Sequence, residues 1–135
     1  MSIIPTELRR LVTERAAARC EYCLMPQEVS IYSHEVDHII ALKDGGQTHP
    51  DNFALSCLPC NRYKGADFAT LDPESGEIIP LFNPRRHIWA EHFALRDARI
   101  EGITDIGEAT ARLLKFNAPK RIRVRRLLIE QRRYP

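Results

Sequence analysis

The sequence lacks any long apolar run. No stretch approaches the roughly 18 consecutive apolar residues that a bilayer-spanning helix needs, which excludes a membrane-embedded protein. The first residues also lack the basic patch and apolar stretch of a secretory signal. We therefore expect a cytoplasmic protein with no membrane partner.

The sequence also has a small net charge and few aromatic residues. The net charge is +2, with 20 basic and 18 acidic side chains, and only 7% of the residues are aromatic. Nevertheless, 44% hydrophobic and 28% charged residues are typical of a globular protein rather than a disordered one. A length of 135 residues fits one domain with its own core.

No cysteine is left unpaired by the spacing pattern. The four cysteines form two Cys-x-x-Cys pairs, Cys20 with Cys23 and Cys57 with Cys60, separated by 33 residues. In a reducing compartment this spacing predicts one tetrahedral structural Zn²⁺ site with no open position for chemistry. Buried free cysteines and a thioredoxin-like redox pair are the alternatives, and the sequence has no βαβ pattern around either pair to favour the latter.

Hydrophobic periodicity and turn residues predict the order of the elements. The first half is expected to contain a helix over residues 5–19, a strand over 29–40, a strand over 53–56 and a helix over about 58–67. Weaker patterns predict a hairpin around 71–79, a helix starting with a capping box at 105–108 and continuing over 109–116, and a last helix over 120–133.

Polar residues of three short segments stand beside the cysteine pairs. They are Asp37-His38 within Glu35-Val36-Asp37-His38-Ile39-Ile40, Asn52 within Pro50-Asp51-Asn52-Phe53, and Asn61-Arg62-x-Lys64 after Cys60. With this arrangement, residues 18–68 resemble the HNH endonuclease family in its subtype with two zinc-binding Cys-x-x-Cys pairs. The third residue of the family name is Asn61 here, where many members have histidine.

The resemblance implies a role for each polar residue of these segments. His38 is the general base, Asp37 and Asn61 ligate a divalent metal, and Asn52 orients the His38 imidazole. Histidine has an unperturbed pKa near neutrality, which suits the activation of water. A carboxylate and an amide oxygen are hard ligands that suit Mg²⁺ or Mn²⁺, with Ni²⁺ as a further candidate.

The fold implied by the resemblance is α+β. Residues 1–68 form a small zinc-stapled ββα-metal core together with an N-terminal helix. A hairpin and helical extension over 69–135 completes the same single domain. Adjacent residues of a regular strand point to opposite faces, so Asp37 and His38 line one site only if the strand ends or bends there. The Asp44-Gly45-Gly46 loop makes such an ending reasonable.

The small net charge conceals an uneven distribution. Residues 118–135 carry seven basic and one acidic side chains, whereas residues 67–117 carry six and nine. Two interpretations of the basic last helix are open. In one, the helix packs through an apolar stripe and presents a cationic face to phosphate. In the other, its arginines form ion pairs with the acidic middle segment. Further candidates for phosphate contact are Arg62, Lys64, Arg85 and Arg86.

The resemblance predicts a metal-dependent endonuclease that hydrolyses phosphodiester bonds in DNA, most simply double-stranded DNA. The first alternative is a non-catalytic zinc module that binds nucleic acid through its basic helices, and a thiol redox protein is the weakest. A C₂ dimer is the simplest arrangement for cutting both strands, although no feature of the sequence demonstrates one.

Overall fold

The fold combines short helices with three separate β-hairpins. A computed structural model describes residues 4–135, and no helix in this range is long and apolar enough to cross a membrane. The helices are α1 (Thr6–Arg15), α2 (Leu58–Lys64), α3 (Trp89–His92), α4 (Asp105–Leu113) and α5 (Pro119–Glu130). The antiparallel pairs are β1 (Glu35–His38) with β2 (Phe53–Ser56), β3 (Ala69–Leu71) with β4 (Ile78–Pro80), and β5 (Phe93–Arg96) with β6 (Arg99–Gly102).

The N-terminal helix is shorter than the predicted range of 5–19. Pro5 precedes its first turn, where a missing N–H costs nothing, and the helix ends because Ala17 and Ala18 adopt φ of 53° and 55°. This reversal brings the chain directly to the first cysteine pair. Val12 of α1 is fully buried and belongs to a small apolar cluster with Phe53 and Leu55 of β2.

The central hairpin places His38 opposite Phe53 and Asp37 opposite Ala54. The prediction for β2 is confirmed, but the prediction of a first strand over 29–40 is too long at both ends. Residues 27–29 form a short 3₁₀ turn instead, and Ile31 is 95% exposed, so β-branched residues there bury no face of a sheet. The strand ends at His38, as a shared site for Asp37 and His38 requires.

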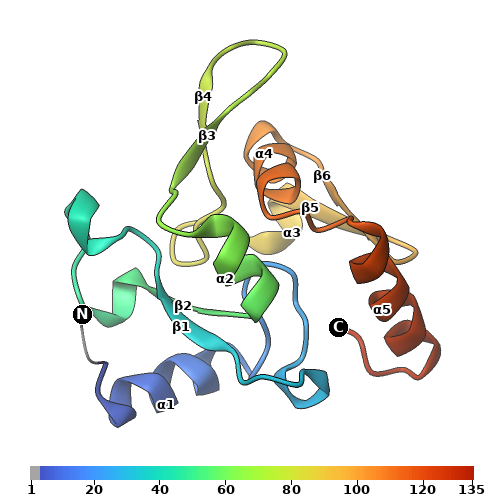
Figure 1. Ribbon diagram of the computed structural model, residues 1–135, viewed down its shortest axis with the longest axis horizontal. Coiled ribbons are helices and arrows are strands. Elements are labelled where there is room, and N and C mark those ends of the chain that lie inside the picture. The colour runs from blue at the N-terminus through green and yellow to red at the C-terminus, as the bar shows by residue number, and fades with distance from the viewer. Residues whose placement is uncertain (1–3) are drawn as a thin grey trace.

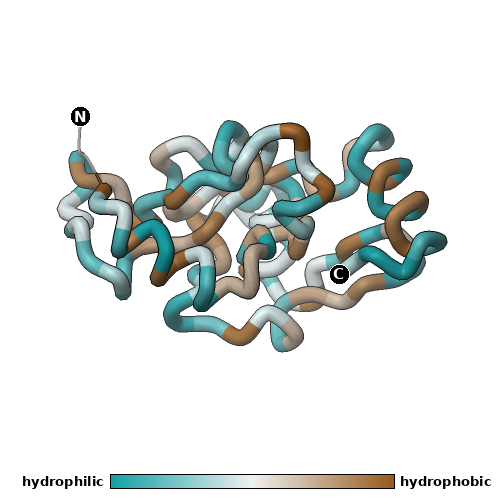
Figure 2. Tube along the Cα trace, turned by 90° about the horizontal axis from the view of Figure 1, so that it is seen from below, coloured by the Kyte–Doolittle hydropathy of each residue, from teal (hydrophilic) through white to brown (hydrophobic). Residues whose placement is uncertain are grey.

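The second half begins with the expected hairpin, whose β3 and β4 project away from the rest of the molecule (Figure 1). Helix α4 starts as predicted at residue 105, and Thr104 caps it by accepting a hydrogen bond from the Gly107 N–H. Helix α5 covers Pro119–Glu130 rather than 120–133, and in Figure 2 hydrophobic and hydrophilic residues alternate along it. Helix α3 and the β5–β6 hairpin were not predicted.

One apolar cluster joins the two halves of the chain. The four cysteines, Tyr22, Ile39 and Ala54 from the first half pack with buried aromatic and aliphatic residues of the second half, which are Phe82, Phe93, Ile100, Leu114 and Phe116. The zinc-binding sulfurs therefore lie inside the main core, and these observations match the predicted α+β fold with a zinc-stapled core.

Candidate active site and zinc centre

The four cysteine sulfurs converge on one point in the core. All four Sγ atoms lie within 4.8 Å of one another, and all four side chains are buried. A tetrahedral site with Zn–S bonds of about 2.3 Å needs sulfurs about 3.8 Å apart, so the cluster fits a structural Zn²⁺ ion. Burial raises the pKa of the Cys20 and Cys60 thiols, whereas hydrogen bonds from neighbouring sulfurs hold the pKa of Cys23 well below its usual range.

The second half of the chain covers this centre with polar contacts. Arg121 of α5 donates to Cys60 Sγ at 3.1 Å, and the Tyr134 hydroxyl donates to the Cys23 carbonyl at 2.6 Å. Burial lowers the pKa of Arg121, but the negative charges of Cys60 and Cys23 raise it more, so the net shift is upward. The cationic side chain offsets part of the charge that four thiolates around one Zn²⁺ would leave.

Asp37 faces a buried cation from α2. The Lys64 side chain is 1% exposed, and its Nζ lies 3.0 Å from Asp37 Oδ2 and 3.3 Å from the His38 carbonyl oxygen. Within residues 4–135 the buried Oδ2 accepts no aligned hydrogen bond, and its contact is the ion pair with Lys64. Burial raises the pKa of Asp37, although Lys64 and His38 oppose this shift. This burial corrects the prediction that Lys64 contacts phosphate.

His38 lies at the end of β1 with its ring held on two sides. Nε2 is 3.2 Å from the Thr48 hydroxyl, and the Phe53 ring packs against the imidazole edge to face with centroids 5.0 Å apart. The side chain is partly exposed, so water and substrate can reach it. Thr48 was not predicted, because nothing in the sequence distinguishes it from other loop residues.

Asn52 contacts the backbone of the loop that follows β1. Its Oδ1 accepts from the Ile40 N–H, and its Nδ2 donates to the carbonyls of Ile40 and Gln47, each at 2.9 Å. Position 46 of this loop requires glycine, because a Cβ there would stand 1.8 Å from the Ile40 carbonyl oxygen. The structure thus connects Asn52 to His38 through the loop that carries Thr48, rather than through a direct bond to the imidazole.

Asn61 lies one helical turn before Lys64 on α2 and shares its face. Within residues 4–135 no hydrogen bond uses the Asn61 side chain, which leaves its amide oxygen available for a ligand. Helix α2 packs against β1 (Figure 1), and its Lys64 contacts both Asp37 and the His38 carbonyl oxygen.

The predicted phosphate contacts divide into two surface and two interior residues. Arg62 and Arg86 are exposed. Arg85, a predicted phosphate contact, forms an ion pair with Glu21 instead, and both side chains are largely buried. Glu21 was missed because its partner is 64 residues away in the sequence.

The basic last helix matches neither interpretation completely. Arg125 is fully buried, and donates to the carbonyls of Ala98 and Phe116 and to the Asn117 side chain. Among the described residues, no arginine of α5 forms an ion pair with the acidic middle segment. The remaining basic side chains of the last segment face solvent; they are Lys120, Arg123, Arg126, Arg132 and Arg133.

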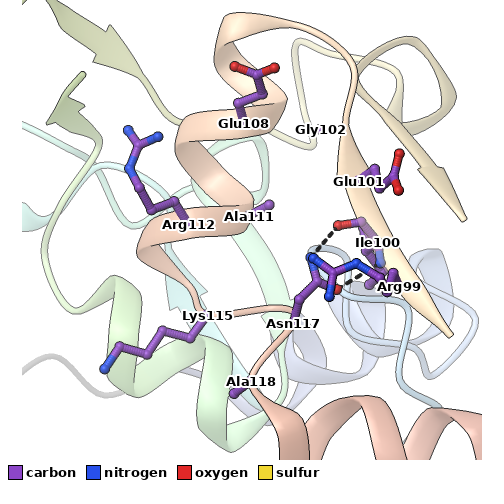
Figure 3. A pocket seen from close by; sticks show the side chains of 10 residues that line it. All are labelled: Arg99, Ile100, Glu101, Gly102, Glu108, Ala111, Arg112, Lys115, Asn117 and Ala118. Atoms are coloured by element: carbon purple, nitrogen blue, oxygen red, sulfur yellow. Dashed lines mark hydrogen bonds between the residues drawn. The ribbon is translucent and has the colours of Figure 1, made fainter. Parts of the chain in front are cut away.

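A cavity of about 560 Å³ lies between β6 and α4 and contains none of the predicted site residues. Asn117 closes one end of it by pairing with both backbone groups of Ile100, while Arg112 and Lys115 extend away from Ile100 (Figure 3). Both Glu101 and Glu108 line it together with three basic side chains, so its charge favours no ligand of one sign.

Comparison with known proteins agrees with this geometry. Residues 20–67 match the family model described as HNH endonuclease. No curated protein and no solved structure matches the chain. The matched segment contains both cysteine pairs, Asp37-His38, Asn52 and Asn61, and so confirms the resemblance on the residues that suggested it. Residues 20–67 of this chain are therefore similar to the HNH endonuclease family.

Proposed function

We propose that this protein is a metal-dependent endonuclease that hydrolyses phosphodiester bonds in DNA. The observation that supports this best is the HNH family segment, in which Asp37 and His38 stand together at the end of β1 against α2. Nucleases of this kind need a base for water and positive charge near the phosphate. The zinc centre supplies neither, because its four sulfurs leave no open coordination position.

His38 is the general base in this proposal. A phosphodiester resists attack because it is negatively charged, and a positioned imidazole removes the proton from the attacking water. The Thr48 hydroxyl and the Phe53 ring restrict the imidazole orientation. Asn52 is a positioning residue, because its three hydrogen bonds fix the loop that brings Thr48 to the imidazole.

Asp37 and Asn61 would hold the divalent cation. The donor set fits, because Asp37 Oδ2 is a buried carboxylate oxygen without an aligned hydrogen bond and Asn61 offers an amide oxygen. When bound, Mg²⁺ or Mn²⁺ supplies positive charge that stabilises the negative charge developing on the phosphate. Lys64 adds a positive charge beside Asp37, which opposes the upward shift that burial gives the pKa of this carboxyl group.

The test is cleavage of supercoiled plasmid by the zinc-loaded full chain in Mg²⁺, Mn²⁺ or Ni²⁺. His38→Ala should reduce the cleavage rate by about 10²–10⁴-fold, the usual contribution of a general base. His49→Asn is the matched control, because the exposed His49 ring contacts the backbone N–H and the carboxylate of Asp51 in its own turn. Equal rates for the unsubstituted chain and His38→Ala would contradict the proposal, and salt-sensitive binding without cleavage would favour the non-catalytic zinc module.

A further inference from the structure

A second cavity, of about 300 Å³, opens beside the catalytic residues and is partly walled by the segment after the family match. Ile39 and Ile40, which follow His38, form one wall. Phe82, Arg86 and His87 lie on the other side. Because this wall lies outside residues 20–67, the family pattern assigns it no role.

Lys64 connects this cavity to the proposed reaction site. The side chain lines the cavity, while its Nζ contacts Asp37 Oδ2 at 3.0 Å and the His38 carbonyl at 3.3 Å. One side chain therefore separates the cavity from the catalytic pair. A group bound there would belong to the substrate residue next to the cleaved phosphodiester.

The lining combines apolar surface with a cationic rim. Phe68 presents an aromatic ring that is 46% exposed, and Leu81 and Phe82 supply a buried apolar floor. Arg86 is exposed at the rim, and no carboxylate is among the described residues that line the cavity. Burial, then the neighbouring His92 and Arg86, lowers the pKa of His87, so its ring is neutral at neutral pH.

The turn that carries Arg86 is anchored to the core. Asn83 accepts backbone hydrogen bonds from Arg86 and His87 through its carbonyl, and from Arg85 through its side chain. Arg85 points inward to Glu21, whose other oxygen accepts the β2 N–H of Leu55. Arg85 is therefore turned inward and Arg86 outward. The Arg85–Glu21 contact fixes the position of Arg86 relative to the catalytic hairpin.

We propose that this cavity binds an unstacked base of the nucleotide next to the scissile phosphate, with Arg86 contacting a backbone phosphate. A nucleotide combines a flat apolar face with an anion, which matches an aromatic wall below a guanidinium rim. An intact duplex hides its base faces by stacking, so an apolar cavity selects a displaced base. The inference rests on the proposed function and names its substrate class, DNA with an unpaired nucleotide at the cleavage site.

The experiment compares two fluorescein-labelled DNA duplexes that differ by one unpaired nucleotide. Fluorescence anisotropy is measured with the zinc-loaded full chain carrying His38→Ala, which is expected to slow cleavage. The bulged duplex should bind at least about fivefold more tightly than the matched duplex, since stacking of one base on an aromatic side chain gives that much or more. Phe68→Ala should abolish the difference, and Phe68→Leu, which keeps apolar volume without an aromatic face, should reduce it.

Two surface variants serve as matched controls. Ile31→Ala removes an exposed apolar side chain outside the cavity and should leave the preference intact, as should Arg10→Ala on α1. Arg86→Ala should weaken binding of both duplexes equally and reduce the slope of log affinity against log salt by about one. Equal affinity for the two duplexes, or a preference that survives Phe68→Ala as it survives Ile31→Ala, would overturn the inference. Plasmid cleavage by the unsubstituted chain tests the proposed function separately.

Discussion

The family segment, residues 20–67, and the extension, residues 69–135, bury charged groups in different ways. In the family segment the buried Lys64 ammonium faces a carboxylate, Asp37. In the extension the buried Arg125 guanidinium faces the neutral acceptors of Ala98, Phe116 and Asn117. The ion pair joins two groups of opposite charge, whereas the carbonyl and amide contacts surround one charge with neutral dipoles that hold segments of the extension together.

The two regions also differ in what holds them together. The family segment has short strands and depends on four sulfurs, while the extension supplies most of the aromatic rings in the shared cluster. Neither region has a closed apolar core alone, because the cysteines lie among Phe82, Phe93 and Phe116. The family segment is therefore stabilised by residues outside its family pattern.

Removal of zinc should have the largest effect on this comparison. Structural Zn²⁺ contributes about 10–16 kcal/mol to the folding of small zinc domains, so chelation should unfold the family segment. Because the cluster is shared, backbone amides of β5, β6 and α4 should also lose protection from hydrogen exchange. Mass spectrometry with and without chelator measures this, and reloading with Zn²⁺ is the control. Retained protection over 93–113 would show that the extension is stable alone.

Lys64→Met should cost about 3–5 kcal/mol of the free energy of unfolding, because it leaves the Asp37 carboxylate buried without a partner. Chemical denaturation measures the loss, and Lys43→Met in the exposed turn after β1 is the control. Adding Asp37→Asn to Lys64→Met should recover part of the stability, because no lone charge remains. A double variant as unstable as the single one would show that packing, rather than charge, explains the loss.

Arg125→Met should destabilise the extension by about 2–4 kcal/mol, because buried carbonyl groups of Ala98 and Phe116 lose their donor. Its neighbour Arg126 is exposed, so Arg126→Met should change stability by less than about 0.5 kcal/mol. The two variants remove the same charge, and thermal unfolding compares them directly. Equal effects would mean that net charge, not the buried contacts, determines the difference.

The smallest expected effect concerns His87, which lies where the two regions meet. Burial, His92 and Arg86 hold its pKa below 6.5. Between the folded pKa and 6.5 the unfolded chain binds more protons, so the contribution of His87 to stability is present above pH 6.5 and is lost as pH falls through the folded pKa. NMR titration should show a midpoint below 6.5 that moves upward in Arg86→Ala. An unchanged midpoint would place Arg86 farther from the imidazole.

The sequence predicted the family segment better than the extension for a physical reason. The two cysteine pairs and Asp37-His38 are short-range patterns. A single zinc site requires the two cysteine pairs to converge. The β5–β6 hairpin turns at Asp97, a non-glycine residue with φ of 52°, so it carries none of the usual Asn-Gly or Gly-rich turn signals. Helix α3 has four residues, too few for a detectable helical period.

Whether a given charged side chain is buried or exposed was the least predictable property of the site. Lys64 and Arg85 look like surface residues in the sequence, and each is buried because a carboxylate from a distant segment meets it, Asp37 or Glu21. Such partners depend on how the elements pack rather than on local pattern. For the same reason Arg121 and Arg125 could not be separated from the exposed arginines of α5.

The contact between the Tyr134 hydroxyl and the Cys23 carbonyl joins positions 111 residues apart. During synthesis on the ribosome, residues 20–67 emerge well before Arg121 and Tyr134, which contact Cys60 and Cys23 in the finished fold. The four thiols are thus complete as a metal-binding set while they are still uncovered. Zinc can enter an open nascent site, and the later residues then close over it, so the order of translation itself favours metal loading before burial.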